Sequence, residues 1–344
     1  MLSHVMKSPT WKRAGWALVV LTVTHSPGWP ARKRATDQPR SDSVHGAAVL
    51  WRDPKDWATR DLFYGPGGKK HEPRGRFVFV KEDLGGTNPK FVVRGADGVK
   101  WKVKLGLEAR PETVASRIAW AAGYYASEDY FVRDVRIGGL PEHLHRGQKL
   151  IGPGGVVHHA RFKREPEDEK KIGVWQWNGD EFTGSREWNG LRVLMALLNN
   201  WDLKDVNNAV YRVGSERVYM VSDLGTGFGS AGRTWPRQRA KDNLDSYRRS
   251  KFIRRITSDT VDFQAPARPM FVYLVNPKEY LGRVRLERLG RHVPRADAKW
   301  LGQLLARLSP AQIRDAFRAG GYSFEEIEAF SSLVEDRISV LTDL

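Results

Sequence analysis

Three side chains in one short stretch of the sequence have the types and spacing that phosphate chemistry needs. Asp202 and Asn207 are five residues apart, and Asp223 follows sixteen residues after Asn207. In phosphoryl transfer one carboxylate takes or orients the proton of the attacking hydroxyl, while an amide and a second carboxylate hold the metal ions. The stretch therefore predicts a site for a nucleotide with divalent metal, against the alternative of two ordinary turns.

The residues between these side chains predict a hairpin. Apolar residues alternate with polar or small ones over 209–213, Gly214 marks a turn, and a second apolar run covers 218–221. Two such runs joined by a short glycine turn are typical of antiparallel strands. Asn207 and Asp223 would then lie side by side at the open ends of the hairpin.

Upstream, residues 77–105 contain three strand patterns. The first two runs are 77–80 and 91–93, and an Asp97-Gly98 pair before the third predicts a hairpin turn. In the third run, side chains alternate between the two faces of a strand. One face is apolar and the other basic: Val99, Trp101, Val103 and Leu105 against Lys100, Lys102 and Lys104.

A helix is predicted directly after the third strand. Pro111 suits its first turn, Val114 and Ile118 follow at helical spacing, and Gly123 marks its end. Glu112 lies near its start, where the helix dipole favours an acidic residue in any case.

The sequence motifs around Asp202, Asn207 and Asp223 resemble those of the protein-kinase-like fold. The run from Asp202 to Asn207 is similar to the D-L-K-x-x-N catalytic loop, and the D-L-G that begins at Asp223 is similar to the D-F-G metal-binding turn. This resemblance implies that Asp202 is the catalytic base and that Lys204 contacts the γ-phosphate. It also implies that Asn207 and Asp223 bind Mg²⁺ or Mn²⁺, with ATP as the nucleotide.

The strand lysines complete the resemblance. Residues 101–104 resemble the V-A-I-K strand, which makes Lys104 the nucleotide lysine and leaves Lys102 as the second choice. Lys102 stands where kinases place a small residue under the base, so it departs from the family pattern. The resemblance further implies that Lys104 pairs with a helix glutamate, either Glu112 or, as the alternative, Glu108.

The phosphate-binding loop of ordinary protein kinases is not present in full. Only Gly85 and Gly86, followed by Thr87, offer backbone N–H groups for phosphates in the expected region. This departure argues against an ordinary eukaryotic-type protein kinase. It fits the divergent relatives better, namely HipA-like toxin kinases, spore-coat and secretory-pathway kinases, and the lipid-kinase branch.

The predicted fold class is α+β and, by the resemblance, bilobal. A small antiparallel β lobe with one helix would span residues 41–140 and bind the nucleotide. A larger, mainly helical catalytic lobe would span 141–344, with glycine-rich residues 147–156 as a hinge or loop between the lobes. Apolar periodicity predicts a helix from Arg186 that leads the chain to Asp202.

The C-terminal third combines a basic run with a helical tail. Residues 233–255 are rich in Lys and Arg, and they form either a solvated helix or a platform for an acidic or phosphorylated partner. Capping boxes that begin at Ser309 and Ser323 predict two helices of the tail.

The first 40 residues do not belong to this fold. Lys7, Lys12 and Arg13 precede an apolar stretch over 14–24, which is too short to span a bilayer as a helix. A basic start before a short apolar run is typical of an export signal. The protein is therefore expected in the periplasm or outside the cell, or in the cytoplasm if the segment is only an extension.

Composition limits the partners. The formal net charge is +17, which attracts nucleic acid, anionic lipid or acidic substrates. No helix-turn-helix, RNA-binding aromatic motif or zinc finger accompanies the charge, which argues against nucleic acid. The absence of cysteine excludes disulfides and thiolate zinc sites. No stretch is long enough for a membrane span.

These observations support one leading interpretation and two alternatives. The leading one is an ATP- and metal-dependent kinase-like phosphotransferase that acts on an unknown protein, small molecule or anionic polymer. The first alternative is a non-catalytic, pseudokinase-like protein that binds an anionic envelope partner. The second is a nucleotidyl transferase on the same fold.

Overall fold

The structure is a computed structural model, and it describes residues 46–166, 169–229, 241–266 and 277–344. The predicted export signal lies outside the described residues, and so do residues 233–240 of the basic run predicted over 233–255. All described residues belong to one unit, His45–Leu344.

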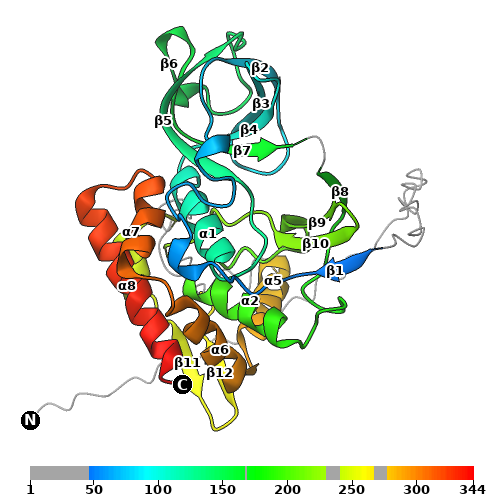
Figure 1. Cartoon of the computed structure of the whole chain (residues 1–344), viewed down its shortest axis with the longest axis vertical. Coiled ribbons are helices and arrows are strands. Elements are labelled where there is room, and N and C mark those ends of the chain that lie inside the picture. Colours follow the sequence, from blue (N-terminus) through cyan, green and yellow to red (C-terminus); the bar gives the residue numbers. More distant parts are fainter. Residues whose placement is uncertain (1–45, 167–168, 230–240, 267–276) are drawn as a thin grey trace, which may run out of the picture. The chain divides into compact units, whose positions relative to one another are not determined.

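The first large element is a sheet of six strands (Figure 1). The strands are β2 (Phe77–Glu82), β3 (Lys90–Gly95), β4 (Lys100–Leu105), β5 (Asp129–Gly138), β6 (Ile151–Gly152) and β7 (Val156–Glu165). Their order is β4-β3-β2-β5-β7-β6, and β4 also pairs with β7. The extra pairing closes five of the strands into a barrel. The three strands predicted over residues 77–105 are confirmed.

One pairing in this sheet differs from the prediction of a wholly antiparallel lobe. Strands β2 and β5 run parallel, with Phe77 opposite Ile137 and Val78 opposite Gly138. Between β4 and β5 the chain passes through a helix, and a crossover of this kind is what parallel strands require. The remaining pairings in the sheet are antiparallel.

The barrel interior is apolar and rich in aromatic side chains. Phe77 lies 5.1 Å from Phe162, and Trp101 lies 6.0 Å from Tyr130, measured between ring centroids. Trp101 and Val103 of β4 are buried among them. Because side chains alternate along a strand, the lysines of β4 lie on the outer face of the barrel, as the sequence pattern predicted.

The predicted helix is α1 (Ala109–Ala121), and it packs on the outer face of β5 and β7. Its other side contacts a C-terminal helix, so almost every residue of α1 is buried. The chain enters the helix through Gly106, whose φ of 85° suits glycine. This arrangement fixes the start of α1 directly beside the end of β4.

A second sheet carries the hairpin. Its strands are β1 (Ala47–Val49), β8 (Lys170–Gly173), β9 (Asn208–Val213) and β10 (Glu216–Val221), in the order β1-β10-β9-β8. Strands β9 and β10 pair antiparallel from Val213 opposite Glu216 to Asn208 opposite Val221. The predicted hairpin is confirmed, and its open ends bring residue 207 next to residue 222.

Helices and a small sheet form the rest of the described chain. The helices are α2 (Arg186–Leu197), α3 (Leu244–Arg249), α5 (Pro277–Gly290), α6 (Arg295–Leu305), α7 (Pro310–Ala319) and α8 (Phe324–Thr342). The small sheet contains β11 (Ile253–Ile256), β12 (Thr260–Phe263) and β13 (Val293–Pro294). The fold is therefore of mixed α and β class. None of the helices described has both the length and the apolar character needed to cross a membrane.

Local sequence signals in this part are confirmed. Helix α2 begins where predicted, capped by Ser185, and both predicted capping boxes are present, at Ser309 with Gln312 and at Ser323 with Glu326. Such caps satisfy backbone N–H groups that have no partner within the helix.

The glycine-rich residues 147–156 do not act as a hinge between lobes. They form the connection that includes β6 and leads back from β5 into β7, and these two strands pair with each other in the barrel. The barrel therefore takes strands from both sides of residue 140. The division of the chain at that residue stays a prediction.

Candidate active site

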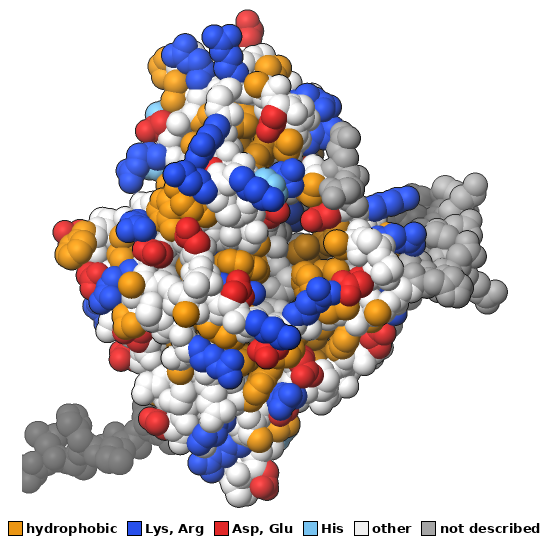
Figure 2. Space-filling view, in the orientation of Figure 1, with side chains coloured by type: hydrophobic (Ala, Val, Ile, Leu, Met, Phe, Trp, Pro, Cys, Tyr) orange, Lys and Arg blue, Asp and Glu red, His pale blue; other side chains and the backbone are white. Residues whose placement is uncertain are grey.

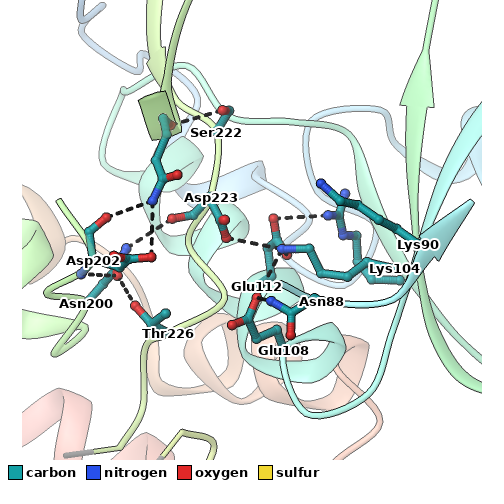
Figure 3. Close-up of polar contacts among 12 residues, drawn as sticks. Asn88, Lys90, Lys104, Glu108, Glu112, Asn200, Asp202, Ser222, Asp223 and Thr226 are labelled. Carbon is teal, nitrogen blue, oxygen red and sulfur yellow. Dashed lines mark hydrogen bonds and ion pairs between the residues drawn. The ribbon is translucent and has the colours of Figure 1, made fainter. Parts of the chain in front are cut away.

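Lys104 is the centre of a buried ion cluster (Figure 3). The residue is 5% exposed, and its Nζ lies 2.7 Å from Glu112 Oε2. The same atom lies 3.1 Å from Asp223 Oδ1 and 3.2 Å from Glu108 Oε2. Both helix glutamates offered as partners therefore contact the lysine, together with the predicted metal ligand Asp223.

Strand alternation and the position of α1 explain this contact. Val103 and Leu105 point into the barrel, so Lys104 between them points outward, where α1 lies. Glu108 is the residue that precedes α1, and Glu112 is one turn further on, on the same side of the helix. The two glutamates therefore approach Lys104 from one direction, and the D-L-G turn brings Asp223 from another.

A second buried cation supports the cluster from β7. Arg161 stands opposite Lys104 in the β4–β7 pairing and is 3% exposed. It lies 3.1 Å from Glu112 Oε1 and donates a 2.9 Å hydrogen bond to Asp129 Oδ1. Sequence reasoning missed Arg161 and Asp129, because no local pattern indicates that β7 pairs with β4.

Further partners of Glu108 come from distant parts of the chain. Asn88, at the end of the β2–β3 turn, donates a hydrogen bond to Glu108, and Lys241 forms an ion pair with it. The Glu108 carboxylate thus accepts hydrogen bonds from side chains of three separate segments, which carry Lys104, Asn88 and Lys241. This places the start of α1 at the meeting point of the barrel and of the chain that follows the D-L-G turn.

Opposite charges favour the ionised forms of Lys104, Asp223 and Glu108, and Glu112 is the exception. Burial opposes the charge of Lys104, but Glu112 and Asp223 outweigh it and raise the pKa of the lysine. Burial would raise the pKa of Asp223, but Lys104 lowers it below the ordinary aspartate value. The pKa of Glu108 is lowered in the same way, with burial outweighed by Lys104. For Glu112, burial is the larger influence, and its pKa is raised.

The predicted catalytic loop is ordered around Asp202. Asn207 Nδ2 donates to the main-chain oxygen of Asp202 at 2.9 Å and lies 3.3 Å from its Oδ2. Lys204 Nζ is 2.7 Å from Asp202 Oδ1, and the Lys204 side chain is 67% exposed. Ser222 donates its backbone N–H to the Asn207 main-chain oxygen at 2.8 Å, which ties the loop to the segment that holds Asp223.

Asn200 and Thr226 are two functional candidates that the sequence did not single out. Asn200 is fully buried, and its Nδ2 lies 3.4 Å from the main-chain oxygen of Asp223. Its Oδ1 accepts from the backbone N–H of Asp202 and from the Thr226 hydroxyl. Figure 3 shows this group on the opposite side of Asp223 from Lys104. Asn200 therefore fixes the relative position of Asp202 and Asp223.

The side chains around Asp223 are of the type that binds a divalent metal ion, and in this structure the Lys104 ammonium contacts all three of the carboxylates. Single carboxylate oxygens of Glu108, Glu112 and Asp223 lie within 4.8 Å of one another. Carboxylates are preferred ligands of Mg²⁺ and Mn²⁺. Among the described residues of the cluster the carboxylates outnumber the cations: Glu108, Glu112, Asp129 and Asp223 against Lys104, Arg161 and Lys241. The Asn207 amide nitrogen faces Asp202, which leaves its oxygen for a metal ion.

Lys102 and the glycine pair lie outside this cluster. Lys102 Nζ is 3.1 Å from Glu165 and 3.6 Å from Asp83, so it does not share the contacts of Lys104. Gly85 donates its backbone N–H to Asp83 Oδ1 at 2.9 Å, and that donor is therefore engaged. A Cβ at Gly86 would stand 3.7 Å from the Nζ of Lys90, which places the glycine turn over that lysine.

Comparisons with known proteins give distant similarities only. No family model and no curated protein sequence matches this chain. A Helicobacter pylori proinflammatory kinase, CtkA, is 12% identical over 77% of this chain and 95% of its own, with a TM-score of 0.42. The Golgi casein kinase is 10% identical over 79% of this chain and 73% of its own, with a TM-score of 0.32. Its Mn/ADP-bound form is 11% identical over 78% of this chain and 73% of its own, with a TM-score of 0.33.

Proposed function

We propose that this protein is a kinase-like phosphotransferase that uses ATP with Mg²⁺ or Mn²⁺. One observation carries the proposal. Lys104 Nζ lies 3.1 Å from Asp223 Oδ1, although the residues are 119 positions apart. The neighbour of Asp223, Ser222, is hydrogen-bonded to the loop that places Asp202 beside Asn207. A lysine, a helix glutamate and a turn aspartate around one point are the groups that bind a metal-bound triphosphate.

The residues take distinct roles in this proposal. Lys104, held by Glu112, binds the phosphates nearest the metal. Asp223 and Asn207 are the metal ligands. Asp202, whose carboxylate is fixed by Asn207 and Lys204, accepts the proton of the acceptor hydroxyl. The barrel with α1 serves as the small lobe, and the helices from α2 onward serve as the large lobe.

Each of the chain's own groups has a defined part in such a reaction. A bound metal ion neutralises charge on the phosphates as the terminal group is transferred. Asp202 positions the acceptor hydroxyl and takes its proton, a contribution that is typically 10²- to 10⁴-fold in rate. Lys204, at the exposed edge of the loop, balances the charge of the terminal phosphate.

The test is transfer of labelled terminal phosphate from ATP to the protein itself or to added acceptors, with Mg²⁺ or Mn²⁺. Asp202→Asn and Asp223→Asn should each reduce transfer by about 10²-fold or more, because each removes a charged group from the reaction. Asp205→Asn is the matched control. Asp205 lies on the same loop, but its carboxylate contacts Arg285 at 2.6 Å and the backbone of Trp177.

The comparison of the three variants decides the proposal. Loss of transfer in the first two and near-normal transfer in the control would support it. If all three transfer phosphate as fast as the unchanged protein, the site does not catalyse the reaction. Circular dichroism of each variant shows whether a loss of transfer merely reports unfolding.

A further inference from the structure

Four lysines lie near Lys104 on β4, on the strands to either side of it and beyond, and we call them the lysine cluster: Lys90, Lys102, Lys163 and Lys171. Lys90 stands directly opposite Lys104 in the β3–β4 pairing. Lys102 is two residues from Lys104 on β4, on the same face, and stands opposite Lys163 on β7. The lysine cluster therefore extends over the three neighbouring strands β3, β4 and β7 of the outer barrel face.

The second sheet extends the lysine cluster. Lys163 Nζ lies 5.8 Å from the centre of the Tyr211 ring, and Tyr211 on β9 stands opposite Lys171 on β8. Lys163 and Lys171 thus approach one aromatic side chain from the two sheets. Figure 2 shows Lys and Arg side chains spread over the barrel on the side of the molecule that it draws.

The positive charge of the lysine cluster is only partly neutralised. Asp83 lies 3.7 Å from Lys90 and 3.6 Å from Lys102, and Glu165 lies 3.1 Å from Lys102. Within the described part of the chain, neither Lys163 nor Lys171 has a carboxylate within 4.0 Å. Four ammonium groups therefore face two carboxylates.

The lysines also repel one another. Burial lowers the pKa of Lys171, and Lys163 and Lys102 lower it further. Burial lowers the pKa of Lys90 too, against the attraction of Asp83. A bound anion would relieve this repulsion, since an opposite charge close by favours the charged form of a lysine.

The two halves of the site thus carry opposite excess charge. Around Asp223 the carboxylates exceed the cations, which suits a divalent metal ion. Along the lysine cluster the ammonium groups exceed the carboxylates, which suits phosphate oxygens. A flat, uncharged nucleotide base is instead bound mostly by apolar walls. On this face Lys102 lies two residues from Lys104 and stands opposite Lys163, so the strand surface next to Lys104 is charged and not apolar.

We infer that the phosphate donor is recognised by its phosphate chain, through the lysine cluster, and that its base is dispensable. This rests on the proposed phosphotransferase function. Inorganic triphosphate would then serve as a donor. Its terminal phosphorus–oxygen bond breaks as a bond from the acceptor oxygen forms, the acceptor proton passes to Asp202, and diphosphate leaves in place of ADP.

Calorimetric binding of three ligands to the full chain tests the inference in the presence of Mn²⁺ or Mg²⁺. The ligands are ATP, inorganic triphosphate and adenosine, all at one salt concentration. Triphosphate should bind within about threefold of ATP, because the phosphates supply the recognition, and adenosine should not bind at millimolar concentration. An affinity for triphosphate that is more than about thirtyfold weaker than the affinity for ATP would overturn the inference.

Lysine variants test the cluster itself. Lys163→Gln and Lys171→Gln should each weaken triphosphate binding roughly tenfold, the size of one charge-assisted hydrogen bond. Lys170→Gln is the matched control, because Lys170 neighbours Lys171 on β8 but points to the opposite face of the strand. If Lys170→Gln and Lys171→Gln bind triphosphate with equal affinity, the lysine cluster does not bind the phosphate chain.

The outcomes separate this inference from the proposed function. Normal affinity in both lysine variants, with transfer from ATP still lost in Asp223→Asn, overturns the inference and leaves the phosphotransferase standing. Triphosphate binding that depends on Lys163 and Lys171, with transfer unchanged in Asp223→Asn, overturns the phosphotransferase instead. Phosphate transfer from inorganic triphosphate that is lost in Asp202→Asn supports both.

Discussion

Replacing Arg161 with Met should lower the free energy of unfolding by about 3–5 kcal/mol at neutral pH. Arg161 lies 2.9 Å from Asp129 and 3.1 Å from Glu112, and all three side chains are at most 3% exposed. At an effective dielectric constant near 20, each contact is worth about 5 kcal/mol. Removing the guanidinium also recovers its desolvation cost of several kcal/mol, which leaves a net loss in the range seen for broken buried pairs.

The loss in free energy of unfolding caused by Arg161→Met should shrink as the pH falls. The pKa of Glu112 is already raised by burial, and Arg161 is the larger of the charges that oppose this. Without Arg161 the folded-state pKa rises further above the unfolded value. A raised pKa penalises the folded state at pH values above it, and the penalty disappears below the unfolded value. The loss in free energy of unfolding caused by Arg161→Met should therefore be smaller at pH 5 than at pH 7.

Urea denaturation followed by tryptophan fluorescence at the two pH values measures both effects. Arg164→Met is the control, because Arg164 lies three residues further along β7 and pairs with Glu128 at 3.6 Å near the surface. Such a pair is worth about 1 kcal/mol at most. The buried cluster is not held together by these charges if Arg161→Met lowers the free energy of unfolding no more than Arg164→Met does. The same conclusion follows if the loss in Arg161→Met is equal at the two pH values.

Two further predictions concern acid stability and helix capping. The pKa of Asp223 is lowered by Lys104 against the effect of burial, so the stability it confers is present above its unfolded pKa and is lost below about pH 4. Melting temperature should therefore fall more steeply with acid in the unchanged protein than in Lys104→Met; parallel curves would refute this. Ser323→Ala should cost about 1 kcal/mol in urea denaturation, because it removes the cap of α8. Ser332→Ala, at an exposed position within the same helix, should be close to neutral, and an equal loss in both variants would argue against the cap.

Local chemistry in the sequence predicted most of the elements that carry the candidate site. The alternation over residues 99–105 identified both a strand and the face on which Lys104 lies, because side chains alternate on any strand. The apolar runs and the glycine turn between Asn207 and Asp223 predicted the hairpin for the same kind of reason. Capping boxes located the starts of α7 and α8, since caps depend on residues only three apart.

Contacts between distant segments could not be predicted in this way. The closure of the barrel by β4 and β7 places Arg161 beside Lys104, and nothing near either residue in the sequence specifies that pairing. The glycine-rich residues 147–156 carried a turn signal, but only the pairing of β5 with β7 shows that they connect two strands of one barrel. The same holds for Asn200, whose type is common in loops and whose role comes from its two neighbours.

The sequence by itself determined which residues are able to do chemistry and which short elements carry them. Only the tertiary structure decided how their charges combine. It gave Lys104 two glutamates instead of one, buried Arg161 between Glu112 and Asp129, and gathered Lys163 and Lys171 around Tyr211. The physical reason is that an ionisable group is governed by the charges and the burial around it, and these come from strands and helices far apart in the chain.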